Sequence, residues 1–191
     1  MYRIKGLRNL DLLIRFNYNQ ILAEVDVKKG EQLSKAILIA TLAHEGQFDK
    51  GGNPYILHPL TVLHKLRSSN EDEQVAAVLH DVIEDCSGKA INLPNGTKEI
   101  SYQMLVEEGI SDRAIQILRL LTKVPGQTAL EYQVGVLSDV GAMRVKREDL
   151  RTNSDLRRLK NRNITEKDIA RVAKYMQFFA AIETELEKYD H

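Results

Sequence analysis

Four residues able to bind a metal ion or transfer a proton stand close together in segment 78–85, which reads VLHDVIED. Residues four apart share one face of a helix, which pairs His80 with Glu84. The same rule pairs Asp81 with Asp85. Burying these groups in an apolar helix is costly unless something neutralises their charge. A divalent cation would neutralise them and leave carboxylates for proton transfer; the alternative is a helix end whose polar residues simply reach water.

The apolar residues around this segment predict the element that positions it. Val75, Val78, Leu79, Val82 and Ile83 have the spacing of a buried helical stripe, so we expect one helix over 71–85. No alternation of apolar and polar residues is long enough to favour a strand elsewhere. The sequence therefore predicts an all-α fold, a bundle of about eight helices. The remaining helices are expected over 7–27, 31–45, 59–68, 101–108, 111–123, 128–138, 139–159 and 165–189.

Two irregular segments interrupt the helical pattern. Gly51, Gly52 and Pro54 predict a loop over 46–59, which delivers His58 just before the next helix. A loop of this length in a compact domain is often functional. Segment 86–100 contains Asn95-Gly96 and is expected to be a polar loop or a short hairpin.

Composition narrows the class of protein. The 191 residues contain 27 basic and 27 acidic side chains, a balance that argues against a nucleic-acid-binding arm or an electrostatic membrane anchor. No apolar run is long enough to span a bilayer, and no signal peptide is recognisable. The single cysteine excludes an intrachain disulfide and fits a reducing compartment. We expect a cytoplasmic protein with a helical extension over 1–30, which could be a packing element, a dimer element or a substrate lid, and one domain over 31–191.

Three motifs together resemble one known family. Residues 43–59 read AHEGQFDKGGNPYILHP, residues 79–85 read LHDVIED, and residues 145–153 read VKREDLRTN. In this order and spacing they resemble the RelA/SpoT-type HD-domain hydrolases, which remove the 3′-pyrophosphate from the alarmones ppGpp and pppGpp in the stringent response. The resemblance runs from about residue 31 to residue 182. It implies an HD-domain fold and a nucleotide substrate.

Carried over position by position, the resemblance implies the site residues. His58, His80, Asp81 and Asp149 would be the metal ligands, and two imidazoles with two carboxylates suit Mn²⁺, with Fe²⁺ or Co²⁺ also compatible. Glu84 and Asp85 would be the acid/base pair that serves the attacking water. Three further residues would contact substrate phosphate or ribose: Lys50, Lys146 and Asn153. His44 also matches a motif position and is expected to form structural hydrogen bonds.

Two positions depart from the alarmone pattern. Asp49 and Asp155 stand where these hydrolases usually carry arginine. The loop arginine would stack on guanine, and an aspartate offers neither the stacking plane nor the positive charge. Asp49 could instead hydrogen-bond to a base or ribose, or pair with Lys50 or with an arginine of the helix that carries Asp149. A different phosphorylated nucleotide such as NADPH, or a non-catalytic nucleotide sensor, therefore remains an alternative.

Overall fold

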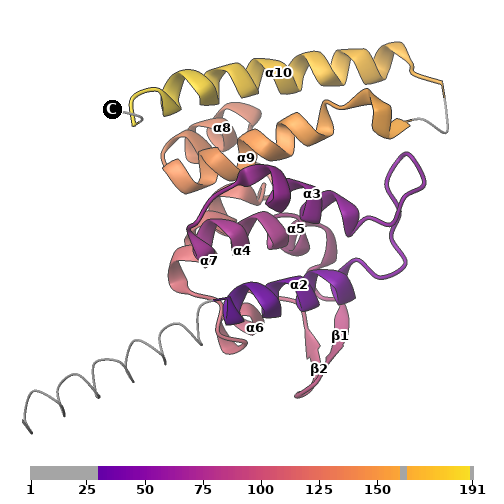
Figure 1. Cartoon of the computed structure of the whole chain (residues 1–191), viewed down its shortest axis with the longest axis vertical. Helices are drawn as coiled ribbons and strands as arrows, with labels where there is room; N and C mark the ends of the chain where they lie inside the picture. The colour runs from indigo at the N-terminus through magenta and orange to yellow at the C-terminus, as the bar shows by residue number, and fades with distance from the viewer. Residues whose placement is uncertain (1–29, 160–162, 190–191) are drawn as a thin grey trace, which may run out of the picture.

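The computed structural model describes residues 30–159 and 163–189, in which helices dominate (Figure 1). The expected all-α fold is confirmed. The expected extension over residues 1–30 lies outside the described residues, apart from Gly30. The described elements are α2 (Glu31–Ala43), α3 (Leu57–Leu66), α4 (Glu71–Leu79), α5 (Val82–Cys86), β1 (Ala90–Leu93), β2 (Gly96–Glu99), α6 (Tyr102–Glu107), α7 (Asp112–Leu121), α8 (Ala129–Leu137), α9 (Val140–Asn153), the 3₁₀ turn η1 (Leu156–Leu159) and α10 (Glu166–Leu186).

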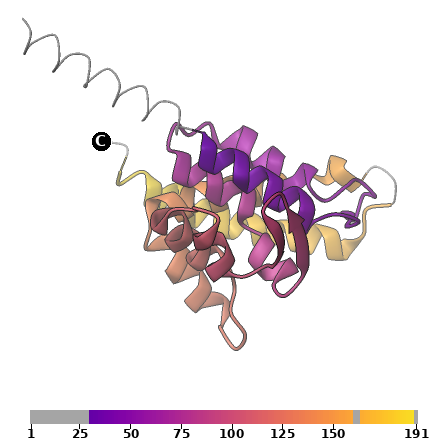
Figure 2. The same cartoon turned by 90° about the horizontal axis from the view of Figure 1, so that it is seen from below.

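Helix α4 lies at the centre of the bundle. It contacts α2, α3, α7 and α9, and its residues 75–79 are fully buried. Helix α10 packs along α9 at one end of the long axis, whereas α2, α6 and the two strands occupy the other end (Figure 1). Seen from below, α2 and the two strands lie in front of α10 (Figure 2). The continuous apolar character of residues 75–79 follows from this position, because a helix surrounded by others buries more than one face.

The predicted helix over 71–85 is not continuous, and this expectation was wrong. Helix α4 ends at Leu79, the chain turns at His80 and Asp81, and α5 begins at Val82. Successive residues of an unbroken helix point about 100° apart. The turn instead brings the two neighbouring side chains together, with His80 Nε2 3.0 Å from Asp81 Oδ2. The break therefore concentrates the two polar groups at one point.

Segment 86–100 was expected to be a polar loop or a short hairpin, and it contains a short hairpin. Strands β1 and β2 pair antiparallel, with Leu93 opposite Gly96 across the turn. Gly96 has a φ of 124°, a backbone conformation that a glycine accepts readily. Ile91 and Leu93 are buried, so the hairpin caps the α2 end of the core.

Capping residues set the ends of the later helices. Ser111 caps α7 and Thr165 caps α10, at the starts of the helices expected over 111–123 and 165–189. The helix expected over 139–159 ends earlier, at Asn153, and continues as the 3₁₀ turn η1. This earlier end lets η1 approach the loop over 46–56, which brings two distant segments to one side of α3.

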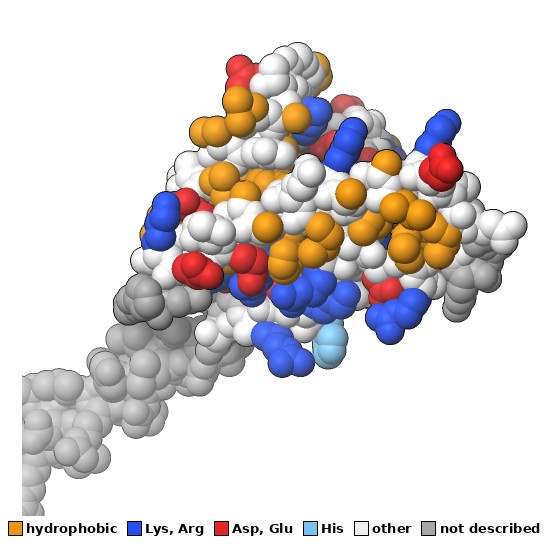
Figure 3. All heavy atoms as spheres, turned by 90° about the horizontal axis from the view of Figure 1, so that it is seen from above, with side chains coloured by type: hydrophobic (Ala, Val, Ile, Leu, Met, Phe, Trp, Pro, Cys, Tyr) orange, Lys and Arg blue, Asp and Glu red, His pale blue; other side chains and the backbone are white. Residues whose placement is uncertain are grey.

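The surface on the α10 side mixes side-chain types. Apolar side chains lie between basic ones across this face (Figure 3). Within α10, Ile169 and Met176 are exposed. Among the described residues, no helix combines the length and apolar character that crossing a membrane requires.

Candidate metal centre and active site

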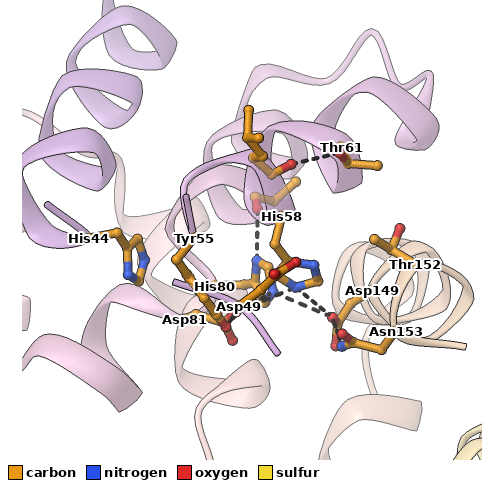
Figure 4. A network of polar contacts seen from close by, with 12 residues as sticks. His44, Asp49, Tyr55, His58, Thr61, His80, Asp81, Asp149, Thr152 and Asn153 are labelled. Carbon is orange, nitrogen blue, oxygen red and sulfur yellow. Dashed lines mark hydrogen bonds and ion pairs between the residues drawn. The ribbon is translucent and has the colours of Figure 1, made fainter. Parts of the chain in front are cut away.

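Four of the residues singled out in the sequence converge on one point. His58 lies in the first turn of α3 and not, as expected, in the loop before it; His80 and Asp81 form the turn between α4 and α5, and Asp149 projects from α9 (Figure 4). His58 Nε2 lies 3.1 Å from Asp149 Oδ1 and 3.5 Å from Asp81 Oδ2. His80 Nε2 lies 3.6 Å from the same Asp149 oxygen. Donor atoms of His58, His80 and Asp81 all lie within 4.8 Å of one another, which is compatible with a shared cation.

His80 provides the strongest indication that this cluster fits a metal ion. Its Nδ1 lies 2.8 Å from the Ala77 carbonyl oxygen, so the ring donates there and presents Nε2 to the cluster. That Nε2 is buried and makes no hydrogen bond within the described structure. A buried polar atom without a partner is costly. A cation would satisfy it, and binding to the unprotonated nitrogen of a neutral imidazole is the usual mode of metal ligation by histidine.

The two carboxylates of the cluster are held by neighbouring side chains. Lys146 Nζ donates to Asp149 Oδ2 at 2.8 Å, and Asn153 Nδ2 donates to Asp149 Oδ1 at 2.6 Å. The Tyr55 hydroxyl donates to Asp81 Oδ2 at 2.7 Å. These contacts fix the orientation of each carboxylate, which is what outer contacts of a metal site do.

The charges in the cluster shift its protonation equilibria. Burial opposes ionisation of Asp149, but the Lys146 ammonium, with help from the two neighbouring histidines, holds the Asp149 pKa well below the usual range. Burial acts the same way on Asp81, yet the positive charge of a protonated His80 lowers the Asp81 pKa to about 2. Burial opposes that protonation of His80, but Asp81 and Asp149 together raise the His80 pKa, so a bound cation would take the place of this proton. Both carboxylates are therefore ionised at neutral pH, and metal ligands must be deprotonated.

The expected acid/base residues, Glu84 and Asp85, both lie on α5 and are exposed. Glu84 Oε2 accepts a hydrogen bond from the Lys123 backbone N–H at 3.3 Å, so this carboxylate is turned toward the end of α7. For Asp85, burial and the negative charge of Asp81 raise the pKa above that of an ordinary aspartate. A raised pKa brings a carboxyl group nearer to the range in which it can exchange a proton at neutral pH.

Lys50 lies in the loop before α3, beside a cavity of about 350 Å³. Phe48 and Tyr55 line this cavity from the loop side, and Tyr175 lines it from α10. Lys50 is exposed, so its ammonium group can reach a ligand held there. The mixture of aromatic and basic side chains is suited to a base and its phosphates.

The other two expected substrate contacts have partners inside the cluster. Lys146 pairs with Asp149 and also lies over the Tyr132 ring, with Nζ 5.5 Å from the ring centroid. Asn153 donates to Asp149 and accepts from Arg158 Nη1 at 3.1 Å. Of the two, Asn153 also lines the 350 Å³ cavity, where a ligand can approach it.

Asp49 organises the loop in which it stands. One of its carboxylate oxygens accepts the backbone N–H groups of Gly51 at 2.8 Å and Asn53 at 2.9 Å. The other lies 3.3 Å from Arg158 Nη2 in η1. These bonds and the Arg158 charge outweigh the effect of burial and lower the Asp49 pKa. One of the roles considered for Asp49 was pairing with an arginine, and the structure contains such a pair. Its partner, Arg158, lies in η1, just after the helix that carries Asp149.

Two residues at the site received no role from the sequence. Tyr55 lies within the first motif, yet nothing in the motif indicated that its hydroxyl would reach Asp81. Arg158 was one basic residue among many; its Nη1 lies 3.2 Å from His58 Nδ1. The opposite charges of Asp49 and Arg158 allow them to pair, but the sequence does not show that the loop and η1 are neighbours. The pairing could therefore not be predicted.

His44 lies beside the cluster and not within it. Its Nδ1 is 2.8 Å from Gln47 Oε1, and its ring centroid lies 4.8 Å from that of Tyr55, with the two ring planes tilted by 43°. Burial lowers the pKa of the His44 imidazole, so the ring is neutral at neutral pH. The hydrogen bond to Gln47 is the kind of structural contact that we expected for this residue.

The fold is that of a known group of proteins. The chain superposes on a solved metazoan protein described as an ortholog of SpoT that hydrolyses ppGpp and plays a role in starvation responses. The TM-score is 0.56 and the sequence identity is 17%, over 83% of this chain and 96% of that one. At this identity the likeness concerns the fold. No protein-family model matches the chain.

Relatives with named activities are similar over part of the sequence. A guanosine-3′,5′-bis(diphosphate) 3′-pyrophosphohydrolase from Vibrio cholerae is 47% identical over 58 residues, which is 29% of this chain and 8% of that protein. The protein of the same description from Aquifex aeolicus is 42% identical over 97 residues, which is 50% of this chain and 12% of the relative. The aligned stretches thus span a small part of these longer relatives. The resemblance to the alarmone hydrolases is confirmed.

Proposed function

We propose that the chain is a metal-dependent phosphohydrolase that removes the 3′-pyrophosphate of ppGpp, pppGpp or a closely related nucleotide, and that residues 31–191 form its catalytic domain. The convergence of two imidazoles and two carboxylates around the unbonded His80 Nε2 carries this proposal. The partial similarity to named 3′-pyrophosphohydrolases supports the substrate class.

In this proposal His58, His80, Asp81 and Asp149 hold one divalent cation. Mixed nitrogen and oxygen donors are compatible with Mn²⁺, which we take as the first choice, and with Fe²⁺ or Co²⁺. When bound, such an ion supplies positive charge that polarises a phosphoryl oxygen and lowers the pKa of water.

The chain's own residues then orient the substrate and move protons. Water attacks the phosphorus that is attached to the 3′ oxygen, the bond to that oxygen breaks, and the nucleotide and pyrophosphate are released. Asp85, whose pKa is raised, accepts the proton of the attacking water and returns it to the departing 3′ oxygen, which leaves as a hydroxyl group. Glu84 is the second carboxylate on α5 and shares this acid/base role. Lys50 and Asn153 contact the substrate from the 350 Å³ cavity, and Lys146 keeps Asp149 ionised.

A second substrate is favoured by one specific observation. The Asp49 carboxylate accepts hydrogen bonds from the Gly51 and Asn53 backbone and so holds the loop in place. This position therefore offers no group that could stack on guanine. Another phosphorylated nucleotide, such as NADPH or an adenosine analogue, would then bind in the same cavity and be cleaved by the same residues.

A nucleotide panel separates these possibilities. Purified protein is incubated with Mn²⁺ and ppGpp, pppGpp, NADPH or an adenosine analogue, and both pyrophosphate and orthophosphate are measured. We expect pyrophosphate from ppGpp. Orthophosphate from NADPH without any pyrophosphate from ppGpp would support the second substrate. Binding of a nucleotide without release of either product would indicate a non-catalytic sensor.

A further inference from the structure

A second, smaller cavity lies on the other side of His58 from the metal cluster. Its volume is about 200 Å³, and the side chains that face it include Asn53, His58, Thr61, Lys65, Thr152 and Arg158. The cavity is bounded by α3, the end of α9 and the loop before α3. Figure 4 shows Thr61 and Thr152 on these two helices, to one side of His58.

Lys65 places in this cavity a positive charge that is not part of an ion pair. It is half-buried in the last turn of α3, and its Nζ lies 3.2 Å from the Thr152 hydroxyl oxygen. Within the described residues, 30–159 and 163–189, no carboxylate lies within ion-pairing distance of this ammonium. A lysine held in a cavity by a neutral hydroxyl retains donor capacity for an anion, because an ammonium group has three N–H bonds.

The two carboxylates that line the same cavity already have cationic partners. Asp155 forms two hydrogen bonds with Arg157, each of 2.8 Å. Asp49 accepts from the loop backbone and pairs with Arg158 at 3.3 Å. The wall thus carries two positive and two negative described side chains, and Lys65 is the one of these four that forms no ion pair. Asn53 and the guanidinium of Arg158 add polar N–H groups to the same wall.

The imidazole of His58 separates this cavity from the metal cluster. Its Nε2 faces Asp149 and Asp81, whereas its Nδ1 lies 3.2 Å from Arg158, which lines the cavity. Two phosphoryl groups of one nucleotide could thus lie on opposite sides of the ring. The cavity shares Asp49, Asp155 and Arg158 with the larger 350 Å³ cavity, so the two cavities lie next to each other.

We propose that Lys65, with Asn53, Thr61 and Arg158, forms an anion subsite that binds the 5′-phosphate groups of the nucleotide whose 3′-pyrophosphate lies at the metal cluster. This inference rests on the proposed function, since that function defines which phosphate is cleaved. The subsite selects nucleotides phosphorylated at both positions and contributes to binding without taking part in the bond cleavage. Lys65 is therefore a specificity-determining residue.

Binding of GDP and of guanosine tests the subsite without any hydrolysis. GDP carries the 5′-diphosphate and lacks the 3′ group, and both ligands are titrated calorimetrically against wild-type protein, Lys65→Met and Lys65→Arg. We expect Lys65→Met to weaken GDP binding about 10-fold, the loss of one charge-assisted hydrogen bond, and to leave guanosine binding unchanged. Lys65→Arg should restore most of the affinity. His64→Ala, an exposed neighbour on α3, serves as the matched control.

The outcomes separate this inference from the proposed function. Equal GDP affinity in the wild type and Lys65→Met, or no GDP binding by the wild type, would overturn the subsite even where ppGpp is hydrolysed. Selective loss of GDP binding in Lys65→Met would support the subsite even where no ppGpp is cleaved. If ppGpp is cleaved, Lys65→Met should raise KM about 10-fold with little change in kcat, while guanosine 3′-diphosphate shows no change. An equal loss for both substrates would contradict a role in 5′-phosphate binding.

Discussion

Removing the Tyr55 hydroxyl should weaken metal binding while leaving all four proposed ligands in place. The hydroxyl donates a 2.7 Å hydrogen bond to Asp81 Oδ2, the oxygen that also faces both histidines. Loss of a hydrogen bond to a charged group costs about 1.5–3 kcal/mol. The Asp81 side chain is 22% exposed, so water can replace part of this contact. We therefore expect Tyr55→Phe to lower affinity for Mn²⁺ about 10-fold, the lower end of the range for residues that orient metal ligands.

The assay is competition between the protein and a fluorescent chelator for Mn²⁺. Tyr102→Phe is a matched control, because its hydroxyl donates a 3.0 Å hydrogen bond to Thr122 and touches none of the proposed ligands. The control should bind Mn²⁺ as the wild type does. Unchanged affinity in Tyr55→Phe would refute the reasoning that this hydroxyl orients Asp81 for a cation.

Three further variants test other parts of the account. Gly51→Ala should raise KM severalfold, because a Cβ at this position collides with the Arg158 backbone carbonyl. The control Gly135→Ala should leave KM unchanged, because a Cβ there makes only an ordinary contact with Leu120. A Gly51→Ala variant with the wild-type KM would contradict the packing of the loop on η1. Asp85→Asn should reduce kcat about 100-fold or more with metal content retained, and the acid limb of the wild-type pH profile should lie above the pKa of an ordinary aspartate. Undiminished turnover would exclude a role in proton transfer. Asp139→Ala should lower the free energy of unfolding by about 1–2 kcal/mol at pH 7, since it caps α9. Because folding lowers the Asp139 pKa, the stabilisation by the ionised carboxylate is present above about pH 4 and is lost as the pH falls through the folded pKa. Urea unfolding of the wild type and Asp139→Ala at the two ends of this pH window measures that loss.

The metal cluster could be located from the sequence because its members stand in short motifs. His58 stands next to Pro59 at the expected start of a helix, which in the structure begins two residues earlier at Leu57, and Asp149 lies in a segment expected to be helical. The turn at His80 and Asp81 could not be foreseen, because the apolar pattern continues across it. The break coincides with the convergence of both side chains on one point, a tertiary arrangement that the local helical periodicity does not predict.

Contacts between distant segments account for the other surprises. The bond from Arg158 to Asp49 joins residues 109 positions apart, and the contact of Arg158 with His58 joins residues 100 apart. The sequence showed that Asp49 replaces the usual arginine, but it did not show that the carboxylate holds the loop together through hydrogen bonds. Lys65 likewise carried no signal, because only the packing of α3 against α9 places it in a cavity.

The central claim is that a divalent cation at His58, His80, Asp81 and Asp149 enables release of pyrophosphate from ppGpp. Its most direct test is to remove metal from the purified protein with a chelator and to titrate Mn²⁺ back while measuring that release. We predict no pyrophosphate from the chelated protein and a rise that saturates near one Mn²⁺ per chain, with His80→Ala and Asp81→Ala together remaining inactive. Undiminished release after chelation, or no release at any Mn²⁺ concentration, would contradict the account.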